Sequence, residues 1–298
     1  MKSHGWTALI AIGAVSVAAA IGIESRRANV ARSDVMSAVD AGLSDLQAGR
    51  FVQAESRLRP AVALARQRLG DVPDTARALN ALGMLDKYTA RFDEGAVLYR
   101  DALRIAERAP PFDAMLVADI LHNLGGLEHA RDRFADGEPW ARRAVEVRAR
   151  ALGPGHVAVA ADRAALAAIL SDEGKRDEAE ALLVDAIATF DRTYGPMHVD
   201  TAVALNNLGA LYQARDDERA ESTYKRALSM KEALLPANHP DIARTANNLA
   251  ILYRRAGRLD EALALYRRAL DIMERAFGPS HPATAAIRDN YKRALASK

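Results

Sequence analysis

The chain has 298 residues, of which half are apolar and only 5% are aromatic, so we expect a core of small aliphatic side chains. It carries 41 basic and 39 acidic residues, which leaves a net charge of +2. This near balance excludes the strongly basic surface that binds nucleic acid, so no nucleic-acid partner is expected. The absence of cysteine excludes disulfides, thiol catalysis and cysteine metal sites.

The amino-terminal segment from Trp6 to Ile23 contains 18 residues without a charge. As a helix it would span about 27 Å, close to the hydrocarbon thickness of a bilayer. We therefore predict that residues 1–23 are a membrane anchor, with the repeats on the non-cytoplasmic side. The alternative is a secretory signal cleaved after Ala18 to Ala20, which would leave a periplasmic or secreted chain. Residues 24–33 are polar and basic, as expected of a tether.

From residue 34 to 298 the sequence repeats itself. The marker leucines of the repeat, spaced 42, 42, 42 and 41 residues apart, are Leu82, Leu124, Leu166, Leu208 and Leu249. A period of this length indicates stacked supersecondary units. In the last full copy, apolar residues recur at helical spacing over 240–255 and over 259–277, with Gly257 between the two stretches and Gly278 after them. Each unit is therefore predicted to be a helical hairpin.

Small residues and tyrosines recur at fixed places in these hairpins. They include Gly83, Gly125 and Gly209 after the marker leucine, Tyr212 and Tyr253 four residues after it, and Ala179, Ala220 and Ala262 in the second helix. This framework resembles the tetratricopeptide repeat, and its 42-residue period, in place of the usual 34, is similar to the repeats of kinesin light chains. The resemblance implies an all-α fold, a right-handed α-solenoid of about six hairpins over 34–298 with a C-terminal capping helix.

Most hairpins are joined by a short linker that ends in histidine. Three linkers read Gly-Pro-x-His, whereas the one after the second hairpin carries Pro110-Pro111, so a differently shaped turn is expected there. The recurring histidines are His156, His198, His239 and His281. Each belongs to a different repeat, so they cannot converge on one metal ion, whose ligands must all lie near 2 Å from it. We interpret them as turn residues before the next helix, and we expect no metal and no cofactor.

No sequence motif for catalysis is present. The chain contains no nucleophile elbow, phosphate loop or zinc-protease motif. Its acidic residues are spread along helices beside arginine and lysine, as is typical of solvated helix faces. We therefore predict that the protein is not an enzyme.

Asparagines precede the marker leucine in several copies, although asparagine is a mediocre helix former. In the family that the chain resembles, the first helices line a concave groove, and an asparagine at this place holds the backbone of a bound peptide. Carried over by position, the groove would show Arg77, Asn80, Lys87, His122, Asn123, Asn206, Asn207, Gln213, Arg244, Asn247, Asn248, Arg254, Asn290 and Arg293. The alternative is that the amides bond only within the solenoid.

These observations predict a non-catalytic scaffold or adaptor, tethered at a membrane through residues 6–23, whose groove binds a protein or an extended peptide. Because Arg244, Arg254 and Arg293 share the groove in the last repeats, an acidic segment is the expected ligand. Two other functions stay open at this point, namely a self-associating structural scaffold and a regulatory subunit of a larger membrane or envelope complex.

Overall fold

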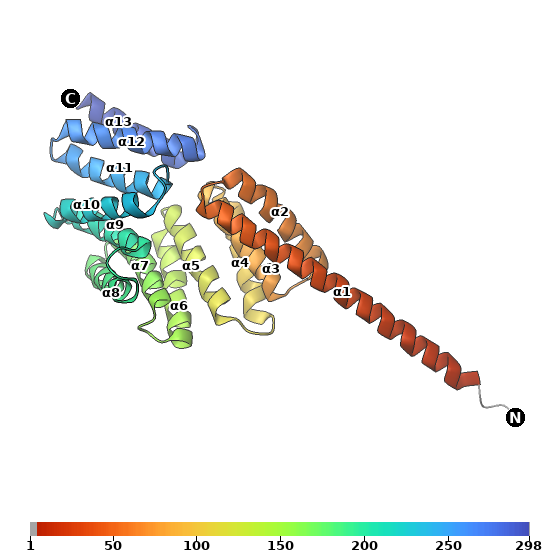
Figure 1. Cartoon of the computed structure of the whole chain (residues 1–298). Helices are drawn as coiled ribbons and strands as arrows, with labels where there is room; N and C mark the ends of the chain where they lie inside the picture. Colours follow the sequence, from red (N-terminus) through yellow and green to blue (C-terminus); the bar gives the residue numbers. More distant parts are fainter. Residues whose placement is uncertain (1–4, 298) are drawn as a thin grey trace.

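The computed structural model describes residues 5–297, with side chains from residue 26 onward. This part of the chain forms thirteen helices and no strand. They are α1 (Gly5–Gln47), α2 (Phe51–Arg68), α3 (Pro73–Tyr88), α4 (Phe92–Arg108), α5 (Ala114–Ala130), α6 (Phe134–Leu152), α7 (Val157–Asp172), α8 (Arg176–Tyr194), α9 (Val199–Ala214), α10 (Arg219–Leu234), α11 (Pro240–Arg255), α12 (Leu259–Phe277) and α13 (Pro282–Ala296). Figure 1 shows them stacked in chain order. The predicted all-α solenoid is confirmed.

The helices are arranged in two layers. Each odd-numbered helix packs against the even-numbered helix that follows it, and each such hairpin packs against the next. The odd-numbered helices also contact one another along the whole stack, from α1 and α3 to α11 and α13, whereas the described even-numbered helices do not. The odd-numbered helices therefore form the inner, concave layer, which carries the residues predicted to line a groove.

Close approach within a hairpin depends on the glycine after the marker leucine. A Cβ on Gly83 would lie 2.7 Å from the ring of Tyr99, and a Cβ on Gly209 would lie 2.8 Å from the ring of Tyr224. Both tyrosines are buried in the core. Glycine at these two places therefore allows a tyrosine of the second helix to pack directly on the backbone of the first.

The recurring histidines begin the inner helices. His156, His198, His239 and His281 are the N-cap residues of α7, α9, α11 and α13, and each accepts a backbone N–H of the first turn through Nδ1. A side-chain acceptor at this place satisfies one of the free donors of a helix end. Their interpretation as turn residues before the next helix is therefore confirmed.

The turn after the second hairpin differs from the others, as predicted. Helices α6, α8 and α12 end at Gly153, Gly195 and Gly278, whose φ angles are positive, between 81° and 88°. Helix α4 ends instead at Ala109 with a φ of −80°, and the cis-linked Pro110-Pro111 follows. The next helix, α5, is capped at its start by Asp113, which takes the place of the histidine and accepts the N–H groups of Met115 and Leu116.

The predicted membrane localisation requires a correction. Over the described residues, no helix combines the length and the apolar character needed to cross a bilayer. This finding contradicts the prediction of a membrane-anchored chain with a periplasmic or secreted alternative, which is not carried further. The stretch from Trp6 to Ile23, on which the prediction rested, lies outside the residues whose side chains are described. Its backbone belongs to α1, which continues without a break into the first hairpin.

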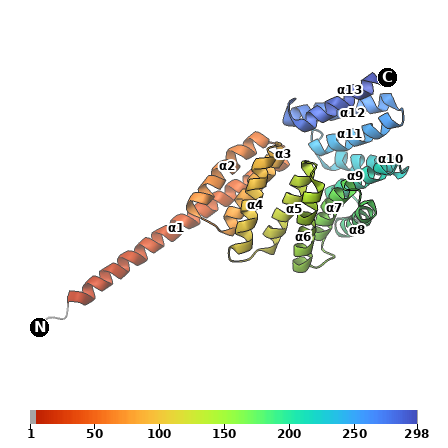
Figure 2. The ribbon, with the colours of Figure 1, turned by 180° about the vertical axis from the view of Figure 1, so that it is seen from behind.

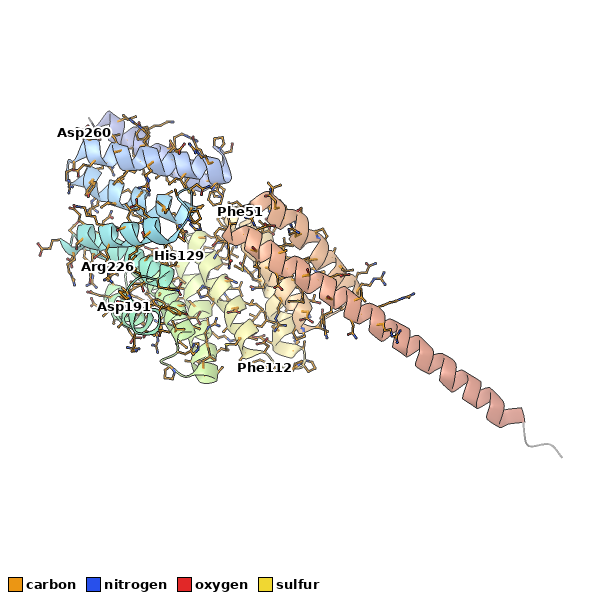
Figure 3. The ribbon with its side chains drawn as sticks, viewed as in Figure 1. Phe51, Phe112, His129, Asp191, Arg226 and Asp260 are labelled. Carbon is orange, nitrogen blue, oxygen red and sulfur yellow. The ribbon has the colours of Figure 1, made fainter. Side chains whose placement is uncertain are left out.

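The two ends of the solenoid meet. In Figures 1 and 2 the ends of α12 and α13 lie next to the junction of α1 and α2. Phe51, at the start of α2, stacks on Phe277, at the end of α12, with ring centroids 4.7 Å apart. Figure 3 shows Phe51 at this junction, on the side of the first hairpin that faces the carboxyl-terminal helices. The inner layer is therefore bent far enough for the last repeat to touch the first.

Candidate functional site: the inner face of the solenoid

The asparagines of the inner face form a ladder that joins successive repeats. Each rung is one hydrogen bond between the inner helices of two repeats. The donor directly precedes the marker leucine, or Tyr291, which takes the place of that leucine in α13. The acceptor lies two residues before the marker leucine of the preceding repeat. The three rungs are Asn123 to Asn80 at 3.0 Å, Asn248 to Asn206 at 3.3 Å and Asn290 to Asn247 at 3.1 Å. These amides therefore form hydrogen bonds within the solenoid, which supports the alternative to peptide binding by the asparagines.

The ladder is interrupted at the fourth repeat, where Ala164 and Ala165 occupy the two asparagine places. Asn207, which would pair with the fourth repeat, is joined only to its neighbour Asn206, at 3.4 Å. Its Nδ2 donates to no partner among the described residues. Asn207 is consequently the ladder position with the most hydrogen-bonding capacity left for a ligand.

A charged cluster replaces the ladder at this interruption. His122 Nδ1 lies 2.8 Å from Asp162 Oδ1, and Arg148 donates to Asp162 Oδ2 at 2.6 Å and to Asp119 Oδ1 at 2.8 Å. Asp162 and Arg148 are buried, whereas Asp119 and His122 remain accessible. Because Asp162 accepts the Nδ1 hydrogen of His122, the other ring nitrogen is left for the open side of the inner face.

The cluster borders a cavity of about 490 Å³ on the inner face. The apolar part of its wall comes from α1 and α3, with Leu43, Leu46 and Met84, and its polar part includes Asn80 and Asn123. This volume lies within the range of pockets that take small ligands or a short stretch of peptide. Three predicted groove residues, Asn80, His122 and Asn123, are thus brought together around one hollow.

Lys87 has an unusual environment for a lysine. Its ammonium makes no hydrogen bond or ion pair within the described part of the chain. It lies 5.9 Å from the centre of the Tyr88 ring and fills the space where a Cβ on Gly126 would be. Burial, and then the charge of Arg244 from α11, lower the pKa of Lys87 to about 8. Arg244 comes from the far end of the solenoid, yet it also acts on Tyr88. The charge of Arg244, in the last full repeat, therefore acts on Lys87 in the second.

The other predicted residues divide into paired and open ones. Arg77 is held by Asp74 and Asp113, and Arg244 by Asp241, so their charges are partly neutralised. Arg254 and Arg293 both lie near the hydroxyl of Tyr266 and act on its pKa, which burial raises. The side chains of Gln213 and Arg293 have no hydrogen-bond partner among the described residues. Arg254 and Arg293 thus form no ion pair within the described part of the chain.

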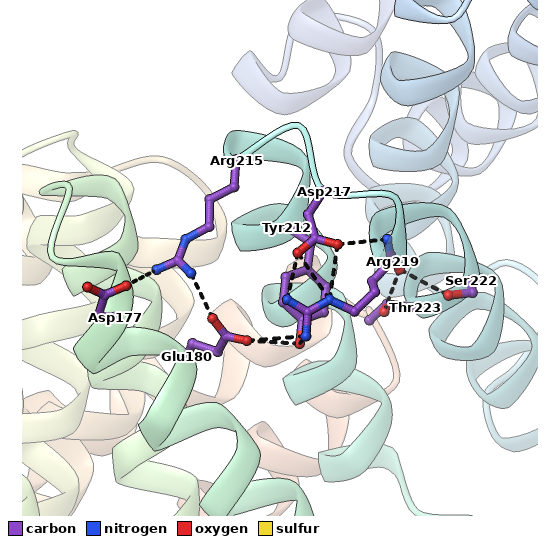
Figure 4. A network of polar contacts seen from close by, with 8 residues as sticks. All are labelled: Asp177, Glu180, Tyr212, Arg215, Asp217, Arg219, Ser222 and Thr223. Atoms are coloured by element: carbon purple, nitrogen blue, oxygen red, sulfur yellow. Dashed lines mark hydrogen bonds and ion pairs between the residues drawn. The ribbon is translucent and has the colours of Figure 1, made fainter.

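A second polar network lies where the two helices of a hairpin join, and Figure 4 shows its copy in the fifth repeat. Glu180 accepts from Tyr212 Oη at 3.2 Å and from Arg215 at 2.8 Å, and the guanidinium of Arg219 lies 3.9 Å from the centre of the Tyr212 ring. Glu221, Tyr253 and Arg258 repeat the same arrangement one repeat later.

Sequence reasoning missed this network, although a signal was present. In both copies the glutamate directly follows an alanine of the repeat framework, Ala179 or Ala220, and it joins the tyrosine of the next repeat. All its charges are paired with one another, so the network joins repeats and offers little to a ligand. Within the described residues, no group of three or more histidine, aspartate or glutamate side chains is placed to hold a metal ion.

A family model described as tetratricopeptide repeat matches residues 35–108, 116–190, 159–233 and 241–298, which together include most of the chain. Among solved structures, BtubC (BKLC) from P. vanneervenii is similar over 78% of this chain and 92% of its own, with a TM-score of 0.55 and 27% identity. A thermophilic tetratricopeptide-repeat protein of Thermus thermophilus shares the fold over 74% of this chain and 99% of its own, with a TM-score of 0.53 and 20% identity.

Curated relatives are similar over a smaller part of the chain. The human protein named clustered mitochondria protein homolog is 32% identical over 110 residues, which is 37% of this chain and 8% of that protein. Its namesake from Danio rerio is 33% identical over 110 residues, with the same coverage. The matched region of the chain thus spans less than a tenth of the length of these relatives.

Proposed function

The chain belongs to the tetratricopeptide-repeat family, and from this premise we propose that it is a non-catalytic scaffold whose inner face binds an extended acidic segment of a partner protein. Repeat solenoids use their concave surfaces for such binding. The observation that carries the proposal is the environment of Lys87, whose ammonium makes no hydrogen bond or ion pair among the described residues, lies near the ring of Tyr88, and has its pKa lowered by burial and by the charge of Arg244.

Two neighbouring cations on a partly buried surface favour an anionic ligand. Bringing Arg244 near Lys87 costs free energy, because like charges repel and the ammonium loses water. A carboxylate placed between them would replace the missing hydrogen bonds of Lys87 and reverse the sign of the local interaction. Charge-assisted hydrogen bonds of this kind are shorter and about twice as strong as neutral ones.

The remaining open groups extend this site along the inner face. Arg254 and Arg293 add positive charge in the last repeats, and Asn207 offers an amide that can hold a peptide backbone. The ligand would therefore be a segment with several acidic residues in an extended conformation. Complementary charge of this kind mainly determines selectivity and the rate of association.

The test measures binding of fluorescent peptides to the full chain by anisotropy, with an acidic peptide library and a library of equal length in which lysine replaces glutamate. Lys87→Gln and Arg254→Glu should each weaken binding of acidic peptides at least tenfold, and Arg254→Glu should flatten the salt dependence. Arg267→Glu is the matched control, because Arg267 is exposed on α12 and has no ion pair among the described residues.

The next residue, Arg268, would be a poor control because it forms an ion pair with Glu232 of the preceding repeat, so its substitution could also change stability. A preference for the basic library, or an equal loss from Arg254→Glu and Arg267→Glu, would contradict the assignment of the inner face. Circular dichroism of each variant would show whether a loss of binding comes from unfolding.

A further inference from the structure

The cavity of about 490 Å³ on the inner face combines an apolar wall with a polar one. Residues of α1 and α3, among them Leu43 and Met84, form the apolar wall. The polar wall comes mainly from α5, with Asp119, His122 and Asn123. A ligand that fills this cavity therefore needs both a hydrocarbon part and a polar end.

The asparagine of this wall has an unused acceptor. Asn123 donates through Nδ2 to Asn80 at 3.0 Å, whereas its own Oδ1 has no hydrogen-bond partner among the described residues. Only 9% of Asn123 is exposed, so its oxygen is largely shielded from bulk water. A buried acceptor of this kind is usually satisfied in a native structure, and leaving it unsatisfied costs free energy. Asn123 therefore favours a ligand that brings a donor into the cavity.

His122 and Asp119 add two further acceptors. His122 Nδ1 lies 2.8 Å from Asp162 Oδ1, and it must carry the hydrogen because a carboxylate only accepts. In the neutral ring, Nε2 then has a lone pair that can accept from a ligand. Asp119 accepts from Arg148 through Oδ1 at 2.8 Å, Oδ2 has no partner within the described part of the chain, and the side chain is 54% exposed. The wall thus presents three acceptors, one of which is charged.

The charge of the cavity wall has the same preference. The lining side chains that carry a charge, with His122 neutral, are Asp119, Arg148 and Asp162, so two carboxylates stand against one guanidinium. A carboxylate of a ligand would be repelled by Asp119 and would meet acceptors where it needs donors. A cation with several N–H groups satisfies both the excess negative charge and the open acceptors.

We propose that the cavity holds the side chain of an arginine from the partner segment. Its stem lies on Leu43 and Met84, and its guanidinium donates to Asp119, His122 and Asn123. Arginine has five N–H donors in one plane and can serve acceptors on several side chains at once, whereas lysine has three donors on a single nitrogen. Its methylene groups cover apolar surface while the charged end stays among polar groups. This inference rests on the proposed function, because it takes the partner to be a segment that lies on the inner face.

The position of Lys87 relates this arginine to the acidic residues of the same segment. The Lys87 ammonium would lie 3.3 Å from a Cβ on Gly126, which follows His122 by four residues, or about one turn, on α5. One helical turn is about 5.4 Å long, and an extended peptide advances about 3.3 Å per residue. An acidic residue at Lys87 and an arginine in the cavity would therefore be about two residues apart. The preferred ligand is an acidic segment with one arginine at this spacing.

The test begins with the full chain and N-acetyl-arginine N-methylamide, a probe that has no carboxylate. An NMR titration of the ¹⁵N-labelled chain follows the side-chain amide of Asn123 and the ring nitrogens of His122. We expect saturable shifts of these signals. N-acetyl-citrulline N-methylamide has nearly the same shape but no charge, so it should bind about fivefold more weakly. Equal binding of the two probes would overturn the proposal.

Asp119→Asn tests the charged acceptor, because asparagine keeps an oxygen for Arg148 but removes the negative charge. It should weaken binding of the arginine probe about fivefold. Asp172→Asn is the matched control, since Asp172 is also a half-exposed carboxylate of an inner helix, paired with His129 at 2.7 Å, and does not line the cavity. An equal loss from both variants would contradict the assignment of the cavity.

Ala161→Leu provides a second variant that leaves every polar group in place. Ala161 lines the cavity from α7 and is partly exposed, so a larger side chain there should fill the space and exclude the probe. Circular dichroism would show that the variant is folded. Unchanged binding of the arginine probe to folded Ala161→Leu would place the probe outside the cavity.

The two proposals can fail separately. The arginine probe has no acidic group, so Lys87→Gln should not weaken its binding. Binding of the probe without binding of acidic peptides would refute the acidic segment and keep the cavity, and the reverse result would refute the cavity alone. In acidic peptides, an arginine two residues from a glutamate should raise the affinity for the parent chain, and this gain should disappear in Asp119→Asn.

Discussion

Arg148 donates from Nε to Asp162 Oδ2 at 2.6 Å inside the interface between the third and fourth repeats. Arg148 lies four residues after a framework alanine in the outer helix, and Asp162 lies four residues before the marker leucine in the next inner helix. At the same two places, the last interface has the buried apolar residues Met273 and Ile287. The repeat architecture therefore accepts either an ion pair or an apolar pair at this position.

This equivalence gives a first prediction. Arg148→Met should lower the free energy of unfolding by about 3–5 kcal/mol, because it leaves the buried Asp162 without its main partner. The double variant Arg148→Met/Asp162→Ile copies the last interface and should recover most of that loss. Urea unfolding followed by circular dichroism measures both, and a double variant less stable than the single one would show that the ion pair is required for more than local charge balance.

Lys231 occupies in the fifth repeat the place of Arg148 in the third, but it has no carboxylate bonded to it. It donates to Thr245 Oγ1 at 2.9 Å, and burial lowers its pKa to about 8. Between this value and the unfolded pKa of about 10.4, the unfolded chain binds more protons than the native one, so stability should rise as the pH increases from 8 to 10. Lys231→Met should reduce this rise and stabilise the protein at pH 7.

Thermal unfolding at several pH values checks the second prediction. Lys292→Met is the control, since Lys292 is exposed on α13, and it should leave the pH dependence as it is. Lys87 also titrates near pH 8, so Lys231→Met should reduce the slope without abolishing it. A slope equal to that of the parent would mean that Lys231 is not the buried base inferred from its surroundings.

A third prediction concerns the glycine after the marker leucine. In Gly83→Ala the new Cβ would lie 2.7 Å from the Tyr99 ring, so the hairpin must move apart. We expect a loss of about 1–3 kcal/mol, as for other overpacked cores. Gly155→Ala, where nothing lies within 4 Å of the added atom, should be close to neutral. Equal stabilities of the two variants in denaturant would contradict the close packing at Gly83.

Two substitutions in the asparagine ladder should affect stability and peptide binding differently. Asn248→Ala removes a bond to Asn206 of the preceding repeat and should cost about 1 kcal/mol. Asn207→Ala breaks no bond between repeats and should cost little stability, yet it should weaken peptide binding if Asn207 holds a peptide backbone. Parallel unfolding and anisotropy measurements distinguish the two effects. The opposite ranking, with Asn207→Ala the less stable variant, would argue against this ladder.

The pKa of Lys87 predicts a pH dependence for acidic ligands. A bound carboxylate raises the pKa of Lys87 from about 8, so binding takes up protons near that pH and weakens as the pH rises above it. Lys87→Arg keeps its charge and should bind equally well up to about pH 10, since arginine does not lose its proton in this range. Titration calorimetry in two buffers with different ionisation enthalpies measures the uptake. If no proton is taken up, the ligand does not contact Lys87.

The sequence by itself determined the solenoid and the course of its inner face. Each hairpin is specified by contacts within one period, such as glycine against tyrosine at Gly83 and Tyr99, and by a histidine cap such as His156 at the start of a helix. These are local features, so their spacing along the chain is enough to predict them. The fixed register of the repeat also explains why the inner position of Asn80 and Asn123 could be derived without a structure.

The tertiary structure alone decided what these residues contact. Small rotations between successive repeats add up along the stack, and their sum brings Phe277 to Phe51 and His281 to Tyr88, although no period in the sequence relates these pairs. It also decided that the amide of Asn248 is used by Asn206, since hydrogen-bond partners depend on distances of a few tenths of an ångström. Contacts within a repeat follow from the sequence period, whereas contacts between distant repeats follow from the accumulated curvature, which the period leaves undetermined.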